Sequence, residues 1–352
     1  MAARLKLLSV TTYVYLPKGS GGSALSTHDM CLSLLQRGVR PTVLARAERE
    51  VARALRRSGI TGAVDTTLGY DVVRALDPVD HIDAVVERIA PTVAVVQSGR
   101  QIACVKRLVA NGVSTVVYVR DVEFDRLEAP FFRHPLVRYI ANSAFTAGAF
   151  RQAFGIECEV IPPVVRRAAY LTEPERTHIV FVNPKPQKGV DIVLALARRL
   201  PHRRFLIVEC WPLGALERLK LRISRAGLRN VTWRAASIDM REVYRHARMV
   251  LVPSRWNEAW CRVVTEAHIS EIPVIATDIG GLPESVGSGG ILIPSDADIG
   301  QWANAVESLW TDAEMYELYV AAARASSERL EIDENHLTER LLATLSSVRG
   351  TS

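Results

Sequence analysis

The stretch that decides the fold is residues 253–267, whose sequence is PSRWNEAWCRVVTEA. It follows from the apolar run Met249–Pro253, which has the composition of a buried strand. A polar loop comes next, and a segment of helical length begins near Cys261 or Arg262. The order of strand, loop and helix predicts one repeat of a parallel α/β sheet.

Two glutamates lie eight positions apart in this stretch, Glu258 in the loop and Glu266 in the helix. The free N–H groups at the start of a helix after a strand suit a phosphate. Carboxylates beside that phosphate would be repelled by it, unless each accepts hydrogen bonds from hydroxyl groups. The pattern therefore indicates a ligand with sugar rings on either side of a diphosphate. Trp256 and Trp260 flank Glu258 and are either core residues or platforms for a sugar ring.

The alternation of strand and helix extends over the whole chain, and the strands are continuous apolar runs, as expected when both faces are buried. It stops at a polar stretch, 163–177, and then starts again. The fold class is therefore α/β, with two successive doubly wound parallel-sheet domains. The predicted strands are Leu5–Val10, Pro41–Ala45, Thr92–Gln97, Thr115–Val119, Val137–Ala141, Glu159–Ile161, His178–Asn183, Arg204–Glu209, Asn230–Trp233, Met249–Pro253, Pro273–Thr277 and Gly290–Pro294.

The predicted N-terminal domain covers residues 1–165, and the predicted C-terminal domain covers residues 166–331. The segment Gly300–Val348 is expected to be helical throughout, and its last part, about 332–352, to pack back on the N-terminal domain. Ligands of such sheets bind at the carboxyl ends of the strands, so we expect the site in a central cleft that both domains face.

Composition indicates a globular protein: of 352 residues, 48% are hydrophobic and 23% are charged. No apolar run reaches the roughly 18–20 residues that span a bilayer. Met1–Val10 lacks the features of a signal peptide, so we expect a cytoplasmic protein. The five cysteines are scattered without a CxxC or Cys/His cluster, which argues against a disulfide framework and a structural zinc site.

The net charge of +6 favours an anionic partner. The densest basic stretch, Arg46–Arg57, predicts a helix with a basic face. That face is either simply solvated or in contact with an anionic membrane, so peripheral location at the inner face of the membrane is an open alternative. No nucleic-acid partner is expected, and the oligomeric state is left open.

Together with residues 272–284 (IPVIATDIGGLPE), residues 253–267 resemble the Glu-x7-Glu motif of the family 4 retaining glycosyltransferases, which have the GT-B fold of two Rossmann-like domains. The resemblance implies that Glu258 contacts hydroxyls of the donor sugar and that Glu266 holds the nucleotide ribose. Cys261 departs from the family, which usually has glycine there, and we expect it to be the first helical residue. The residues implied to contact the donor between the glutamates are Ala259, Trp260, Cys261, Arg262 and Val263.

A second motif, residues 181–191 (FVNPKPQKGVD), leads from a strand through a Pro-rich turn into a helix. An ammonium at this point can neutralise a leaving diphosphate. The resemblance assigns that role to Lys188, so Lys188 and Glu258 are the expected catalytic residues. Asn183 and Pro184 replace the family's usual Gly-Arg; Asn183 is expected at the donor, and Lys185 is a candidate for the missing charge.

The N-terminal half carries a weaker resemblance, in the glycine-rich stretch 19–26 (GSGGSALS). Glycines let the backbone approach a ligand closely. The resemblance implies that Gly22 contacts the donor diphosphate and that Gly21 and Ser26 line the acceptor cleft. Ser26 stands where many members carry histidine.

Two more N-terminal residues follow predicted strands. Arg120 stands where many members have a histidine near the transferred sugar. It either contacts an acidic sugar or a charged acceptor, or it pairs with Asp121 or Glu123. Ser143 has the position of a helix N-cap, and the resemblance leaves a role in the cleft open.

The implied reaction is transfer of a sugar, with retention, from a nucleotide diphosphate sugar to a hydroxyl of a glycan, lipid-linked or small-molecule acceptor, as in polysaccharide or glycoconjugate biosynthesis. The donor is a co-substrate, and neither a cofactor nor a metal is expected.

Asp296 and Asp298 have the DxD spacing of a metal site, but their place predicts a helix cap. His268 is expected to be a packing residue. The alternatives are a nucleotide-sugar epimerase on the same fold and a non-catalytic nucleotide-sugar-binding or scaffold protein.

Overall fold

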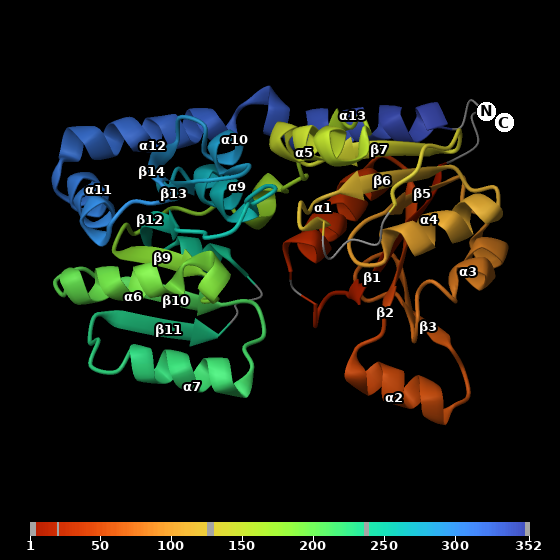
Figure 1. Ribbon diagram of the computed structural model, residues 1–352, viewed down its shortest axis with the longest axis horizontal. Coiled ribbons are helices and arrows are strands. Elements are labelled where there is room, and N and C mark those ends of the chain that lie inside the picture. The colour runs from red at the N-terminus through yellow and green to blue at the C-terminus, as the bar shows by residue number, and fades with distance from the viewer. Residues whose placement is uncertain (1–4, 20, 125–129, 236–238, 349–352) are drawn as a thin grey trace. The chain divides into compact units, whose positions relative to one another are not determined.

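The computed structural model describes residues 5–19, 21–124, 130–235 and 239–348. The chain divides into two compact units. The first unit consists of Met1–Val164 and Glu334–Ser352, and the second unit consists of Val165–Asp333. Each unit has its own sheet with helices on both faces (Figure 1).

The described sheet of the first unit has the strand order β3-β4-β2-β1-β5-β6-β7-β8, and all neighbours are parallel except β3 and β4. Its strands are β1 (Lys6–Val14), β2 (Arg40–Arg46), β3 (Gly62–Asp65), β4 (Asp71–Ala75), β5 (Val93–Val96), β6 (Thr115–Val119), β7 (Val137–Ala141) and β8 (Glu159–Val160). Its helices are α1 (Gly22–Gln36), α2 (Arg49–Arg57), α3 (Ile82–Ile89), α4 (Gln101–Ala110), α5 (Ala144–Phe154) and α13 (Glu334–Ser347).

The core of the first unit has two parts, one on each face of the sheet, because side chains alternate along each strand. Successive residues of a strand point to opposite faces of the sheet. Leu8 therefore packs with the apolar faces of α3, α4 and α5, whereas Leu7 packs with those of α1 and α13. The C-terminal helix is fixed to α1 by a hydrogen bond of 2.9 Å from the Ser33 hydroxyl to Glu334.

The described sheet of the second unit is parallel throughout, with the order β11-β10-β9-β12-β13-β14. Its strands are β9 (His178–Val182), β10 (Phe205–Glu209), β11 (Val231–Ala235), β12 (Ala247–Val252), β13 (Val274–Asp278) and β14 (Gly290–Pro294). Its helices are α6 (Val190–Arg199), α7 (Ala215–Ser224), α8 (Arg241–Tyr244), α9 (Arg262–Ile269), α10 (Leu282–Val286), α11 (Ile299–Thr311) and α12 (Ala313–Ser327), with short 3₁₀ turns η2 (Arg167–Ala169), η3 (Pro186–Lys188) and η4 (Leu330–Ile332).

The strand order of the second unit reverses direction between β9 and β12. Chain segments that leave such adjacent parallel strands emerge at the same edge of the sheet and bound the usual ligand site of the fold. Residues 183–189 follow β9, and residues 253–261 follow β12. The topology therefore brings the two motifs of the C-terminal half together.

Every predicted strand is present within a few residues of its expected bounds. The strands β3 and β4 were not predicted. Strand β3 is a short, half-exposed antiparallel edge strand, and the apolar run of β4 is interrupted by the buried charged residue Arg74. Helix α1 begins at Gly22, within the glycine-rich stretch 19–26. The final segment is not helical throughout, since Asp312 ends α11 and caps α12 through a 2.9 Å hydrogen bond from the Met315 N–H.

The sequence-based domain boundaries were placed after residues 165 and 331, and the observed units change at Val164 and Asp333. In the part of the chain that the structure describes, no helix has both the length and the apolar character needed to cross a bilayer.

Candidate functional site

The two expected catalytic side chains meet in the second unit. The Lys188 ammonium donates a hydrogen bond of 2.6 Å to Oε1 of Glu258, and the Ser254 hydroxyl donates to the same oxygen at 2.5 Å. The two side chains are only 14% and 7% exposed. Short hydrogen bonds between ionised groups in such surroundings are strong, so the pair holds a fixed geometry.

Two indole rings enclose the Lys188 ammonium. Its Nζ lies 4.6 Å from the ring centroid of Trp256 and 5.1 Å from that of Trp211. The rings are 6.1 Å apart and inclined at 67°. A cation over aromatic faces is attracted by their quadrupoles, which adds to the pairing with Glu258. Trp256 thus packs on the lysine, and sequence reasoning did not single out Trp211, which lies in the loop after β10.

Close backbone packing fixes the segment that carries Glu258, here called the glutamate loop (residues 253–261). The Gly281 N–H donates to the carbonyl of Glu258 at 2.6 Å. A Cβ on Gly281 would lie 2.4 Å from the Ala259 carbonyl oxygen, and one on Gly280 would lie 2.7 Å from that of Glu258. The Gly-Gly-Leu-Pro-Glu sequence at 280–284 therefore clamps the glutamate loop.

The lysine turn (residues 183–189) packs on the other side of this loop. Gly189 has a φ of +77°, and a Cβ there would lie 1.9 Å from the carbonyl oxygen of Pro253. The Arg255 N–H donates to the Gln187 carbonyl at 2.9 Å. Only glycine satisfies both the left-handed backbone and the close contact at 189.

Asn183 and Lys185 are both used within the second unit. Asn183 has a φ of +66°, which asparagine tolerates better than most residues, and its side chain accepts a 2.8 Å hydrogen bond from the Trp211 N–H. Lys185 pairs with Glu217 at 2.8 Å, and Glu217 also accepts from the Gly214 N–H. The ammonium of Lys185 is thus engaged at the start of α7.

Glu266 lies in a buried polar network. It is 3% exposed, and its two carboxylate oxygens accept hydrogen bonds from the Tyr244 hydroxyl at 2.7 Å and from Nε of Arg262 at 3.2 Å. The Arg262 guanidinium also donates to the Tyr170 hydroxyl at 2.8 Å. Burial, followed by the charge of Glu266, holds the pKa of Tyr244 well above its usual value, so its hydroxyl remains a donor.

The start of α9 has the backbone that a cysteine accepts without strain. Cys261 has a φ of −104° and is the N-cap, so the first helical residue is Arg262 and not Cys261 as expected. No side chain caps this helix. Burial, with a smaller contribution from Glu258, raises the pKa of the Cys261 thiol to about 12, which keeps it protonated. Ala259 is buried, whereas Trp260 and Val263 are partly exposed.

The candidate residues of the first unit are mostly buried. Ser143 caps α5: its hydroxyl oxygen accepts from the Thr146 N–H at 3.0 Å. Ser26 lies on the buried face of α1. The Arg120 guanidinium stacks 3.8 Å above the ring of Tyr118.

A small cavity of about 130 Å³ lies beside the glycine-rich stretch in the first unit. Gly21, which precedes the first helical residue Gly22, lines it. The buried Gln97 also lines it, donates to the Thr27 hydroxyl, and leaves its Oε1 without a hydrogen-bond partner among the described residues. Sequence reasoning missed Gln97, because it lies at the end of a strand without a motif.

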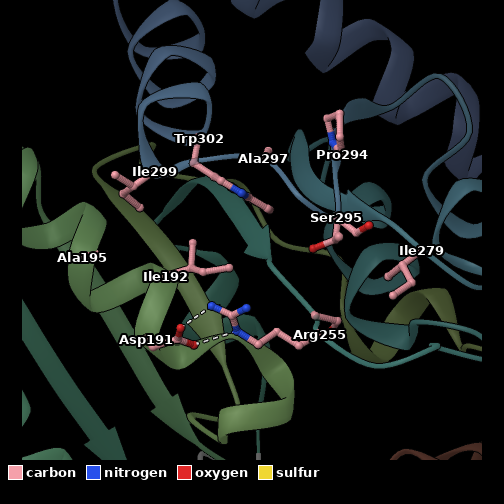
Figure 2. Close-up of a pocket in the computed structure, with 12 residues that line it drawn as sticks. Asp191, Ile192, Ala195, Arg255, Ile279, Pro294, Ser295, Ala297, Ile299 and Trp302 are labelled. Atoms are coloured by element: carbon pink, nitrogen blue, oxygen red, sulfur yellow. Dashed lines mark hydrogen bonds and ion pairs between the residues drawn. The ribbon is translucent and has the colours of Figure 1, made fainter.

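A larger cavity of about 290 Å³ lies in the second unit beside the glutamate loop (Figure 2). The ion pair of Asp191 with Arg255 lies at one side of it. Ser254 is the residue that this cavity shares with the Lys188–Glu258 cluster. Its lining residues are Asp191, Ile192, Ala195, Ser254, Arg255, Thr277, Ile279, Pro294, Ser295, Ala297, Ile299 and Trp302.

Two further sequence predictions are confirmed. His268 is fully buried, its Nε2 lies 3.0 Å from the Gly289 carbonyl oxygen, and burial lowers its pKa to about 3. Asp298 caps α11 by accepting from the Gly300 and Gln301 N–H groups. Within residues 5–19, 21–124, 130–235 and 239–348, no group of three or more His, Cys, Asp or Glu side chains is arranged to hold a metal ion.

Comparison with known proteins identifies the segment that carries this site. Residues 167–326 match the family described as "Glycosyl transferases group 1". The D-inositol 3-phosphate glycosyltransferase of Mycobacterium sp. (strain KMS) is 34% identical over 167 residues, which cover 44% of this chain and 38% of that protein. Its counterpart from Mycobacterium tuberculosis (strain ATCC 25177 / H37Ra) is 33% identical over 168 residues, covering 44% and 34%. The chain thus matches little more than a third of the length of these relatives.

Solved structures resemble the whole chain. HepE (Alr3699) of Anabaena in complex with UDP-glucose has a TM-score of 0.77 at 19% identity, covering 98% of this chain and 100% of its own. Sucrose-phosphate synthase from Thermosynechococcus elongatus has a TM-score of 0.76 at 14% identity, covering 99% and 100%. These similarities confirm the predicted fold class, two parallel-sheet α/β domains as in GT-B glycosyltransferases.

Proposed function

We propose that this protein is a retaining, metal-independent glycosyltransferase that moves a sugar from a nucleotide diphosphate sugar to an acceptor hydroxyl. The observation that carries the proposal is the Lys188–Glu258 pair, clamped by glycines within the segment that matches the group 1 glycosyl transferases. HepE was solved with UDP-glucose, so UDP-sugars are the first donors to test.

Lys188 is proposed to stabilise the departing diphosphate, together with the N–H groups at the uncapped start of α9. Negative charge on the leaving group grows in the transition state, so this is the point at which a fixed cation accelerates the reaction. In the free protein the ammonium is paired with Glu258. Donor binding would give Lys188 the diphosphate as a second anionic partner and leave Glu258 able to accept hydroxyls of the sugar.

Glu266 is proposed to hold the ribose. Its two oxygens already accept hydrogen bonds from Tyr244 and Arg262. A carboxylate oxygen has more than one lone pair, so each can accept a ribose hydroxyl in addition. The buried network would then hold the carboxylate in a fixed orientation before the donor arrives.

The chemical step needs no side-chain base. The acceptor hydroxyl attacks C1 of the sugar from the face that the diphosphate leaves, so the new C1–O bond forms where the old one breaks. The proton of the hydroxyl passes to the leaving phosphate oxygen. Configuration at C1 is thereby retained.

The acceptor is proposed to bind at the glycine-rich stretch of the first unit. Gly21 lines the small cavity there, and Gly22 follows at the start of α1. The side chains of Ser26, Arg120 and Ser143, like those of Glu258 and Glu266, are buried in the free protein. A glycan, a lipid-linked sugar or a small molecule would each present the required hydroxyl.

A second candidate function is nucleotide-sugar binding without catalysis. Pro184 stands where related enzymes usually have an arginine, and the neighbouring Lys185 is engaged by Glu217. The lysine turn thus offers Lys188 as its principal cation for the diphosphate. If one cation is too few for catalysis, donor binding would persist without transfer.

The first experiment is a thermal shift assay with UDP, GDP, ADP, TDP and their sugars. A ligand that binds only the folded state raises the melting temperature, so we expect a shift with one nucleotide series. Glu266→Ala should abolish the shift, whereas Glu328→Ala, a change in the exposed acid that follows α12 as its C-cap, should leave it intact. The proposed site is wrong if no series shifts the wild type, or if Glu266→Ala responds like the wild type.

A further inference from the structure

Helix α7 presents an apolar stripe to solvent. Leu216, Leu219 and Ile223 are 64%, 54% and 67% exposed. Their spacing of three and four residues puts them on one side of the helix. The opposite side carries Leu221, which packs against the core of the second unit. Among the described residues, no other helix or strand carries three exposed large hydrophobic side chains.

Cations flank this stripe. Lys220 and Arg222 project from α7, and Arg229 follows in the turn that leads to β11. All three are exposed, and no ion pair joins them to a residue that the structure describes. The one acid of α7 is Glu217, which is turned toward Lys185. The exposed surface of α7 is therefore apolar along its centre and positive at its borders.

The position of α7 leaves this surface accessible on the second unit. Helix α7 lies beside β11, the edge strand of the sheet (Figure 1). Arg225, directly after the helix, stacks 4.8 Å from the ring centroid of Trp233 in β11. Trp233, which is partly exposed, and Arg225 thus extend the apolar and basic surface of α7 along the edge of the unit.

The basic helix of the first unit provides a contrast. Helix α2 exposes Arg49, Arg53, Arg56 and Arg57, but its large apolar side chain, Leu55, is buried. Water alone solvates the exposed arginine side chains of such a helix. Helix α7 combines a similar charge with apolar side chains that water does not favour, so charge and hydrophobicity together distinguish it.

We propose that α7 is the surface by which this protein binds an anionic lipid bilayer. An interfacial helix places its apolar side chains among the acyl chains just below the headgroups, while cations beside them contact anionic headgroups. Leu216, Leu219 and Ile223 supply the first contact, and Lys220 and Arg222 supply the second. The inference does not depend on the proposed transfer reaction, because it uses no residue of the donor site.

The test is sedimentation of the full-length protein with vesicles of phosphatidylcholine alone or mixed with phosphatidylglycerol. We expect the wild type to bind the anionic vesicles and not the neutral ones. The triple variant Leu216→Ser, Leu219→Ser, Ile223→Ser removes exposed side chains only, so it should keep the wild-type circular dichroism. Its partition coefficient should fall by at least about tenfold, because the apolar area that enters the bilayer is lost.

Charge reversal gives a matched pair of variants. Lys220→Glu with Arg222→Glu on α7 should weaken binding by roughly twentyfold or more, since each cation near an anionic surface contributes about 1 kcal/mol. Arg53→Glu with Arg56→Glu on α2 makes the same change in net charge at another site. It should stay within about threefold of the wild type, because α2 has no exposed large apolar side chain to insert into the bilayer.

Three outcomes overturn the proposal. The first is a wild type that does not bind anionic vesicles, and the second is a triple serine variant that binds as well as the wild type. In the third, sedimentation velocity shows a self-associating wild type whose association the triple variant abolishes, with no vesicle binding by either. That result would assign the stripe to a second copy of the chain.

Discussion

The two units have the same kind of sheet but use the polar residues at their strand ends differently. In the second unit, Lys188 and Glu258 follow the adjacent strands β9 and β12 and lie 2.6 Å apart. In the first unit, Ser143 follows β7 and caps α5, and Arg120 follows β6 and stacks on Tyr118. The second unit thus concentrates charge at one point, whereas the first uses these residues to support its own fold.

The proposed donor binding in the second unit accounts for this difference. Binding a diphosphate requires a cation and oriented N–H groups at fixed positions. A variable acceptor imposes no such common demand. The family match, which lies within residues 167–326, follows the same division between the units.

The largest expected effect that tests this comparison is on catalysis in the second unit. Lys188→Ala removes the cation that is proposed to stabilise the leaving group, so the rate of nucleotide release from the donor should fall by about 100- to 1000-fold. Initial rates with the donor identified by thermal shift would measure it.

Lys185→Ala is the matched control for this prediction. It removes the other cation of the lysine turn, which is paired with Glu217, and should change the rate by less than about threefold. Equal losses in the two variants would mean that the turn acts through its overall charge and would contradict the assignment to Lys188.

The next effect concerns the stability of the clamp. Gly189→Ala forces a Cβ against the Pro253 carbonyl at a φ of +77° and should destabilise the second unit by about 2–4 kcal/mol. Differential scanning calorimetry would show the lower transition temperature.

Gly148→Ala in α5 is the counterpart in the first unit. Apart from the neighbouring residues and the backbone of α5 itself, no atom lies within 4 Å of the added Cβ. Because alanine also favours the helix, this change should stabilise the first unit by about 0.5–1 kcal/mol. If Gly189→Ala and Gly148→Ala shift the unfolding transition temperature in the same direction, the predicted difference between the two glycines is wrong.

The smallest effect separates structure from donor binding in the first unit. Ser143→Ala removes the cap of α5, and the unfolding free energy should fall by about 1 kcal/mol. Because the cap lies in the unit that does not carry Lys188, the thermal shift caused by the donor nucleotide should keep its size. If the folded Ser143→Ala protein shows no thermal shift with the donor nucleotide, Ser143 belongs to the binding site.

The sequence alone predicted most of the local structure and named the candidate residues of the donor site. Apolar runs of strand length and the helical segments between them were enough to place the strands and the two units. The spacing of Glu258 and Glu266, with Lys188 before Gly189, pointed to the second unit. These signals are local, because each depends on residues that are close along the chain.

Only the tertiary structure decided how these residues are held. Lys188 and Glu258 are 70 positions apart and meet because β9 and β12 are neighbours in the sheet. Trp211 comes from a third strand end. The engagement of Glu266 by Tyr244 likewise joins residues from separate helices. Contacts between distant segments depend on strand order and close packing, and no local pattern in the sequence records them.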